Sequence, residues 1–430
     1  MLRDLPRYAA PILIGFVLLC SIASCSPNQT GLEQEAANIK KSVTELVSSG
    51  KIPGAVVYLI DGGEVKGKLV AGFKDIEAQK PLKEDDIFRL YSMSKPLTST
   101  AIMMLVDQQK LSLDTPLEEI LPEFSNMQVY VSGDLDEMVT EPINRSITML
   151  DLLRHHSGVT YHFMGNSPVH AYYRKYGVMR DTPVGREPGD GAPAESLDQL
   201  MERLGKAPLL HQPGQEFAYS YSTTVLGAVV EKITGKALNI ALKEMIFDPL
   251  EMSDTKFLLD EADASRFVVN YMMTEDGIKR IEDWENTDYK DPSRLLDGGG
   301  AIAGTGADYL HFVQMLGQGG IYKGHRVLSQ ESLEVMVSNP INASFGNVLF
   351  DFGLGFEVGS EHSSKDKRLP LESFGWSGSG NTYFWINPKT GDGVVFMTQV
   401  ILPPKFQAQG DYLRRIVFDQ ISDDETSDKH

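Results

Sequence analysis

Apolar residues follow two different periods along the chain. From Leu32 to Leu46 they recur at helical spacing, which predicts an amphipathic first helix. The apolar runs 55–60 and 66–73 flank a glycine-rich turn and predict a β-hairpin. Strand-like runs return near the C-terminal end, at 352–359, 372–388 and 391–401, before a last predicted helix at about 407–421.

The middle of the chain has mainly helical periodicity, which is clearest at 148–158, 223–235, 239–250 and 306–320. Strands at both ends with helices between them predict an α/β (α+β) fold. Residues 35–95 and 290–422 would form a discontinuous α/β domain, and residues 96–289 a helical domain. The stretch 159–196 is rich in tyrosine, proline and glycine; it is either a functional cover or a disordered insert.

Residues 1–24 have the composition of a signal peptide. Arg3 and Arg7 precede an apolar core that is short for a membrane span and ends in small residues. The sequence IASC, which ends at Cys25, resembles the lipobox of bacterial lipoproteins and so implies lipidation of Cys25. An ordinary cleaved signal with an incidental cysteine is the alternative. We expect an exported lipoprotein at the periplasmic face of the outer membrane, with residues 25–34 as a flexible tether.

The net charge limits the possible binding partners, and the cysteine content limits the possible disulfides. The net charge of −19 argues against nucleic acid and against adsorption to anionic lipid, so membrane contact is expected through the lipid anchor. Cys20 and Cys25 are the only cysteines, so we expect no disulfide in the mature chain. Residues 423–430 are expected to be a solvated acidic tail, and the oligomeric state stays open.

Several hydrolase and metal-site patterns are absent from the sequence. It has no G-x-S-x-G, no H-E-x-x-H, no P-loop and no zinc-like set of cysteines and histidines. We therefore expect neither a metal nor a cofactor. The pattern S-x-x-K occurs four times, but only Ser92 and Lys95 stand at the start of a long apolar helix.

Ser92 and Lys95 make chemical sense as a pair. Residues three apart share a helix face, so the Lys95 amine is expected to reach the Ser92 oxygen. A serine hydroxyl becomes a good nucleophile when a base takes its proton, and a desolvated lysine can be that base. The alternative is an N-cap serine beside a lysine whose charged end extends to water.

Four other segments carry a family resemblance: 151–161, 213–235, 297–316 and 374–388. They resemble the serine β-lactamase and penicillin-binding-protein superfamily, most of all its class C β-lactamase-like branch with the family VIII carboxylesterases. The resemblance implies a β-lactamase/transpeptidase-like fold. In that fold an antiparallel sheet is flanked by helices, a helical domain is inserted, and the active site lies between the two parts.

The resemblance also assigns roles in catalysis. Ser92 matches the acylated nucleophile, Lys95 its partner base, and Tyr219 the tyrosine that relays protons. The backbone N–H groups of Ser379 and Ser92 would form the oxyanion hole, and losing one such donor typically costs about 3 kcal/mol of transition-state stabilisation.

Two departures from the lactamase pattern concern the substrate. Trp376, Ser377 and Gly378 stand where lactamases have Lys-Thr-Gly, so the lysine that attracts a substrate carboxylate is replaced by tryptophan. Tyr221 stands where lactamases commonly have an asparagine that contacts the substrate amide. Both changes favour a small, uncharged acyl ester over a β-lactam.

Aromatic residues of the 159–196 stretch are weaker candidates. Tyr161, Phe163 and Tyr172 either line an acyl or alcohol pocket or belong to ordinary core packing. His155 matches a family position near the site, and a structural role is favoured.

The sequence therefore predicts a serine hydrolase that forms an acyl-enzyme on Ser92 and needs no cofactor. A carboxylesterase is the first reading. A β-lactamase or a D-amino peptidase acting on peptidoglycan peptides is the second, and a non-catalytic binding lipoprotein on the same fold is the third. The natural substrate and its acyl length stay open.

Overall fold

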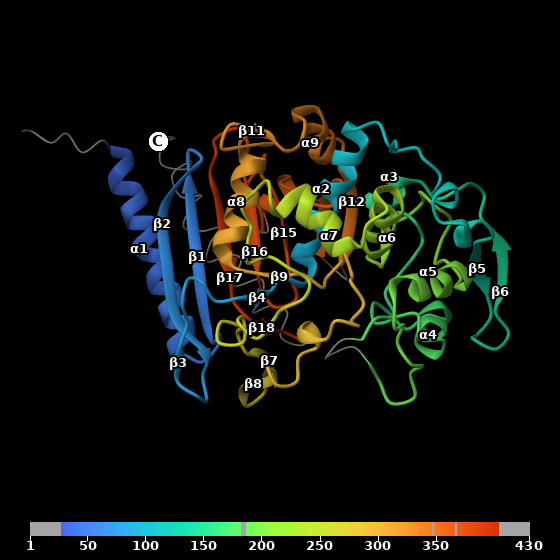
Figure 1. Ribbon diagram of the computed structural model, residues 1–430, viewed down its shortest axis with the longest axis horizontal. Coiled ribbons are helices and arrows are strands. Elements are labelled where there is room, and N and C mark those ends of the chain that lie inside the picture. Colours follow the sequence, from blue (N-terminus) through green and yellow to red (C-terminus); the bar gives the residue numbers. More distant parts are fainter. Residues whose placement is uncertain (1–26, 182–185, 346–347, 366–367, 404–430) are drawn as a thin grey trace, which may run out of the picture.

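A computed structural model describes residues 27–181, 186–345, 348–365 and 368–403. In that part of the chain, nine strands form one sheet in which every neighbouring pair is antiparallel (Figure 1). In spatial order the strands are β12 (Ile341–Phe345), β13 (Val348–Phe352), β14 (Glu357–Val358), β15 (Phe374–Ser377), β16 (Tyr383–Ile386), β17 (Gly393–Met397), β1 (Gly54–Asp61), β2 (Glu64–Asp75) and β3 (Lys80–Pro81). Strands from both ends of the chain thus meet at the β17–β1 pair.

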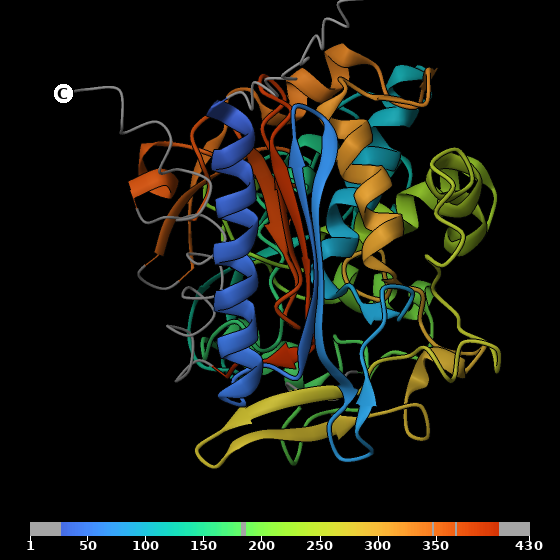
Figure 2. The ribbon, with the colours of Figure 1, turned by 90° about the vertical axis from the view of Figure 1, so that its left-hand side faces the viewer.

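Alternation along the strands gives the sheet two apolar faces. On one face, Val57 of β1 and Phe396 of β17 pack under α1 (Pro27–Ser48), which runs along the sheet in Figure 2. On the other face, Val56 and Met397 pack toward α8 (Gly306–Gly317) and the helical part of the molecule. Because side chains alternate with a period of two, neighbours in one strand serve opposite layers.

The helices and helical turns lie mainly between the two strand-rich ends of the chain. Besides α1 and α8 they are α2 (Ser94–Asp107), α3 (Met149–Leu153), α4 (Pro168–Lys175), α5 (Leu197–Lys206), α6 (Ser222–Thr234), α7 (Leu238–Leu242), α9 (Gln330–Val337), α10 (Glu361–Lys365), the 3-10 turns η1 (Tyr91–Met93), η2 (Leu117–Glu119), η3 (Pro122–Phe124) and η5 (Asp288–Lys290), and the π-helical turn η4 (Lys243–Phe247). In Figure 1, α2, α6 and α8 stand beside the sheet, and α4 and α5 lie farther from it.

Four smaller sheets accompany the nine-stranded sheet in the described residues. They are β4 (Phe88–Arg89) with β9 (Ala303–Gly304), β5 (Gln128–Ser132) with β6 (Val139–Pro142), β7 (Asn270–Thr274) with β8 (Gly277–Glu282) and β18 (Val400–Ile401), and β10 (Ile321–Tyr322) with β11 (His325–Arg326). The sequence analysis, which predicts mainly helices in the middle of the chain, does not include the β5–β6 and β7–β8 hairpins. Their strands are only four to six residues long, so an alternation of polar and apolar positions is hard to recognise.

The predicted fold class, an antiparallel sheet flanked by helices with further helices inserted, is confirmed. The N-terminal boundary is wrong in one respect, because α1 begins at Pro27 inside the predicted tether 25–34. Proline suits the first position of a helix, but the polar turn that follows it carries no apolar spacing to signal the helix. Residues 159–196 contain α4 and the approach to α5.

Four predicted features lie outside the described residues: the signal peptide 1–24, Cys25, the last helix at about 407–421 and the tail 423–430. Within the described ranges, no helix combines the length and apolar character that a membrane span requires. The division of the chain into an α/β and a helical domain stays a prediction.

Candidate active site

Ser92 lies on a sharp turn between a strand and a helix. Strand β4 ends at Arg89, the turn η1 carries Ser92, and α2 begins at Ser94. Tyr91 adopts a φ of 47°, a left-handed conformation that is an outlier for a bulky residue. The nucleophile candidate therefore lies just before the N-terminus of a helix, where backbone N–H groups favour developing negative charge.

The amine of Lys95 contacts the Ser92 side chain. Lys95 Nζ lies 3.1 Å from Ser92 Oγ and 2.6 Å from the carbonyl oxygen of Gly299. The lysine is only 1% exposed, and in the described part of the chain no carboxylate forms an ion pair with it. The predicted pairing is present, and the amine does not extend to water. It therefore lies within hydrogen-bond reach of the Ser92 hydroxyl.

A glycine turn fixes the carbonyl that holds Lys95. The Asp297 carboxylate accepts hydrogen bonds from the Gly299 N–H at 2.7 Å and from the Thr224 hydroxyl at 2.6 Å. The Thr98 hydroxyl on α2 donates to the Gly298 carbonyl at 2.7 Å. A Cβ on Gly298 would lie 2.9 Å from the Thr98 hydroxyl oxygen, so glycine permits this close approach.

Tyr219 places its ring beside the lysine. Lys95 Nζ lies 4.7 Å from the centre of the Tyr219 ring and 5.4 Å from that of Tyr161. Tyr219 is half-buried, just ahead of α6, and packs against Tyr161 at a centroid distance of 5.4 Å. The structure thus brings Ser92, Lys95 and Tyr219 together, whereas their chemical roles stay predictions.

The β15–β16 turn reaches the nucleophile turn from the other side. A Cβ on Gly378 would lie 2.4 Å from the carbonyl oxygen of Leu90, and the Thr382 hydroxyl donates to that same oxygen at 3.3 Å. Ser379 is exposed at the tip of this turn. Gly378 before it and Thr382 after it thus approach Leu90, two residues before Ser92, whereas the role of Ser379 in the oxyanion hole stays a prediction.

Trp376 belongs to an aromatic cluster beside Tyr219. Its ring centroid lies 5.8 Å from that of Tyr219 and 5.0 Å from that of Phe352. Phe345 packs edge-on against Tyr219 at 4.9 Å, and Phe350 lies 6.3 Å from Trp376. Ser377 follows Trp376 on β15 and is half-buried. Uncharged rings therefore occupy the side of the site where the lactamase pattern has a lysine.

Tyr221 and Tyr161 are packed together in the interior. Their centroids are 4.4 Å apart, and the Tyr221 hydroxyl lies 2.9 Å from His162 Nδ1. Burial raises the pKa of both phenols, so both stay protonated. Tyr161 also stacks at 4.9 Å on Phe163, which is 52% exposed. Substrate contact by Tyr221 and Tyr161 stays a prediction, and the hydroxyl of Tyr221 already has a structural partner.

His155 is buried and packs against the ring of Tyr219. Its ring lies 4.8 Å from the Tyr219 ring, and its Nδ1 lies 2.9 Å from Ser220 Oγ. Burial and then the positive charge of Lys95 lower the pKa of His155, which keeps the imidazole neutral. Tyr172 is farther out, packed on the half-exposed Tyr176 at 4.4 Å.

Sequence reasoning missed two residues that position the site. Asp297 opens the glycine turn, and Arg180 forms an ion pair with it, Nε to Oδ2 at 2.8 Å. Arg180 lies in the irregular stretch 159–196, so no local pattern marks it. Asp297 directly precedes three consecutive glycines in the segment 297–316, and an acidic residue beside such a turn was the available signal. No cluster of three or more potential metal ligands occurs in the parts of the chain that the structure describes.

Comparisons of sequence and fold with known proteins identify the family of this chain. The family model described as Beta-lactamase matches residues 39–418. Over 372 residues the chain is 31% identical to Protein Rv1367c of Mycobacterium tuberculosis, covering 83% of this chain and 88% of that protein. It is 32% identical over 253 residues to Esterase EstB of Burkholderia gladioli, covering 58% of each. The solved structure of EstCE1, a hydrolase with promiscuous acyltransferase activity, is similar with a TM-score of 0.72 at 24% identity, covering 91% of this chain and 100% of that one. The chain therefore belongs to the beta-lactamase family, and it is a serine hydrolase.

Proposed function

We propose that this protein is a carboxylesterase that hydrolyses small, uncharged acyl esters through an acyl-enzyme on Ser92. The observation that carries the proposal is the contact of Lys95 Nζ with Ser92 Oγ at 3.1 Å, in a buried setting where no carboxylate of the described residues pairs with the lysine. A base within hydrogen-bond reach of a serine hydroxyl is the first requirement of acyl transfer.

The proposed reaction uses these groups in turn. Lys95 takes the Ser92 proton as Oγ attacks the ester carbonyl, and the N–H groups of Ser92 and Ser379 stabilise the oxyanion. Tyr219 passes the proton to the departing alcohol, which leaves the acyl group on Ser92. Water, deprotonated by the same groups, then attacks the acyl-enzyme and releases the acid.

The choice of an uncharged ester rests on the aromatic cluster around Trp376. A substrate carboxylate would lie against rings rather than a cation, and burying an unpaired charge is costly. The exposed ring of Phe163, stacked on Tyr161, extends this apolar lining toward solvent. The similarity to an esterase and to a hydrolase with acyltransferase activity supports the same substrate class.

The test begins with the intact mass after treatment with a fluorophosphonate. The wild type should gain one adduct, Ser92→Ala should gain none, and Ser253→Ala should still gain it. Ser253 is a matched control because it belongs to another S-x-x-K sequence, and its partner Lys256 pairs with Asp263 at 2.7 Å. A well-folded wild type without an adduct would contradict the proposal and favour the non-catalytic binding protein.

The substrate class is tested with two esters of similar length, p-nitrophenyl butyrate and the p-nitrophenyl hemiester of succinic acid. We expect a higher kcat/KM for the neutral ester. Stable labelling of Ser92 by a fluorescent penicillin, with slow ester hydrolysis, would instead favour the peptidoglycan-directed reading. Added methanol tests whether an alcohol competes with water for the acyl-enzyme.

The lipid anchor is a separate proposal that stands on the sequence up to Cys25. In cells grown with an alkyne-bearing fatty acid, the wild type should carry the label and partition with membranes. Cys25→Ser should lose both properties. A wild type that is cleaved but unlabelled would point to an ordinary export signal.

A further inference from the structure

The residue before the nucleophile is held in a strained conformation. Tyr91, with its φ of 47°, takes a backbone position that costs an L-residue free energy unless its surroundings impose it. The direction in which Ser92 presents its hydroxyl and its N–H depends on this one residue. Side-chain contacts of Tyr91 are therefore a means of fixing the nucleophile.

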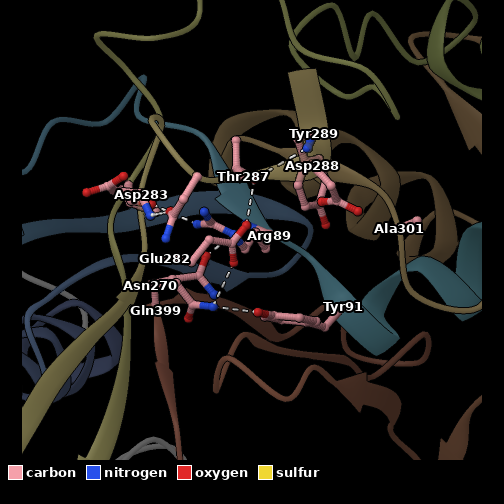
Figure 3. A network of polar contacts seen from close by, with 12 residues as sticks. Arg89, Tyr91, Asn270, Glu282, Asp283, Thr287, Asp288, Tyr289, Ala301 and Gln399 are labelled. Carbon is pink, nitrogen blue, oxygen red and sulfur yellow. Dashed lines mark hydrogen bonds and ion pairs between the residues drawn. The ribbon is translucent and has the colours of Figure 1, made fainter. Parts of the chain in front are cut away.

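The Tyr91 hydroxyl accepts a hydrogen bond from Asn270 Nδ2 at 2.7 Å. The same amide group donates to Glu282 Oε2 at 3.2 Å (Figure 3). Asn270 and Glu282 are paired residues at the base of the β7–β8 hairpin, and both are buried. The hairpin that the sequence did not predict thus supplies the partner of Tyr91.

Arg89, the last residue of β4, belongs to the same network. Its Nε lies 2.9 Å from Glu282 Oε2, and its guanidinium group lies 3.9 Å from the centre of the Phe267 ring. The Thr287 hydroxyl donates to the other Glu282 oxygen at 2.6 Å. Arg89 is fully buried, so both charges depend on each other and on these hydrogen bonds.

The Tyr91 ring also approaches the turn that carries Ser379. A Cβ on Gly380 would lie 3.2 Å from two ring carbons of Tyr91. Gln399, whose Oε1 accepts the Arg89 N–H at 2.7 Å, approaches the same glycine. Tyr91 therefore lies between Asn270 and the residue that follows Ser379.

We propose that Asn270 and Glu282 are positioning residues for acyl transfer, which act through the Tyr91 hydroxyl to hold the Ser92 turn in register with the Ser379 turn. The inference rests on the proposed function, because it concerns the two N–H groups of the oxyanion hole. Donors set in advance where negative charge develops contribute to kcat rather than to substrate affinity.

The experiment compares wild type with Tyr91→Phe, which keeps the ring and removes the hydroxyl. The matched control is Tyr271→Phe, next to Asn270 on β7, whose hydroxyl donates to Glu77 at 2.7 Å instead. We expect Tyr91→Phe to lower kcat for p-nitrophenyl butyrate and the rate of Ser92 phosphonylation by about five- to tenfold, with KM within about twofold of wild type. Tyr271→Phe should keep the wild-type kcat.

Asn270→Ala completes a double-mutant cycle. If Asn270 acts through Tyr91, the double variant should have a kcat no lower than that of the slower single variant. An unchanged kcat in Tyr91→Phe, a change confined to KM, or an equal loss in Tyr271→Phe would overturn the positioning role. A wild type whose Ser92 resists phosphonylation would overturn the proposed function and, with it, this role; a reactive wild type with an equally reactive Tyr91→Phe overturns this role alone.

Discussion

Arg180 forms a buried ion pair with Asp297, and that carboxylate also binds the N–H of the residue whose carbonyl holds Lys95. A residue of the irregular stretch 159–196 is thereby connected to Lys95 through three contacts: Arg180 to Asp297, Asp297 to Gly299, and Gly299 to Lys95. The connection explains how a segment with little regular structure contributes to the geometry of the site. The backbone of Gly299 joins the two side chains: its N–H donates to Asp297, and its carbonyl accepts from Lys95.

Neutralising Asp297 should destabilise the protein. Asp297→Asn keeps the size of the side chain but leaves the largely buried Arg180 charge without its carboxylate, with the Gly300 carbonyl as a remaining acceptor, and we expect a loss of about 3 kcal/mol in the free energy of unfolding. Urea denaturation measures this loss.

Arg180→Met with Asp297→Asn is the control for that prediction, because the double variant removes both charges. It should recover part of the lost stability. A double variant less stable than either single variant would show that the two side chains do not act as a pair.

Local contacts of the site were predictable from sequence, and distant ones were not. The approach of Lys95 to Ser92 follows from i, i+3 spacing at a helix start. The placement of Tyr219 and Ser379 needed a family resemblance, because nothing in either segment fixes its distance from Ser92. The role proposed for Asn270 depends on a hairpin of short strands with weak periodicity, and the ion pair of Arg180 on an irregular segment, so neither residue has a sequence signature.

Removing the Tyr219 hydroxyl should separate proton transfer from packing. Tyr219→Phe keeps the ring contacts with Lys95 and Phe345, so the thermal midpoint should stay close to that of wild type. If the phenol relays protons, kcat should fall by about 10²- to 10⁴-fold, as for loss of a general acid–base. Steady-state kinetics with p-nitrophenyl butyrate measure the effect, and a nearly unchanged kcat would leave Tyr219 as a packing residue.

Replacing Trp376 by lysine should change the preference between neutral and anionic esters. Trp376→Lys introduces a cation at the side of the site that rings now occupy. We expect the ratio of kcat/KM for the succinate hemiester to that for the butyrate ester to rise by about tenfold or more. Trp376→Met, which loses the ring without adding charge, is the control, and an equal rise in both variants would contradict the electrostatic explanation.

The stability of the protein should fall as the pH falls from about 7.5 to 5.5, in part because of His155. Its pKa is depressed in the folded protein, by burial first and then by Lys95, whereas an unfolded histidine titrates near pH 6.5. Below that pH the unfolded state binds a proton that the folded state excludes, so the free energy of unfolding decreases by up to about 1.4 kcal/mol per pH unit for this residue. His155→Asn should flatten the dependence measured by urea denaturation. His325→Asn, at an exposed position on β11, should not. Identical slopes of stability against pH for wild type and His155→Asn would contradict this prediction, because they would show that protonation of His155 does not cause the loss of stability.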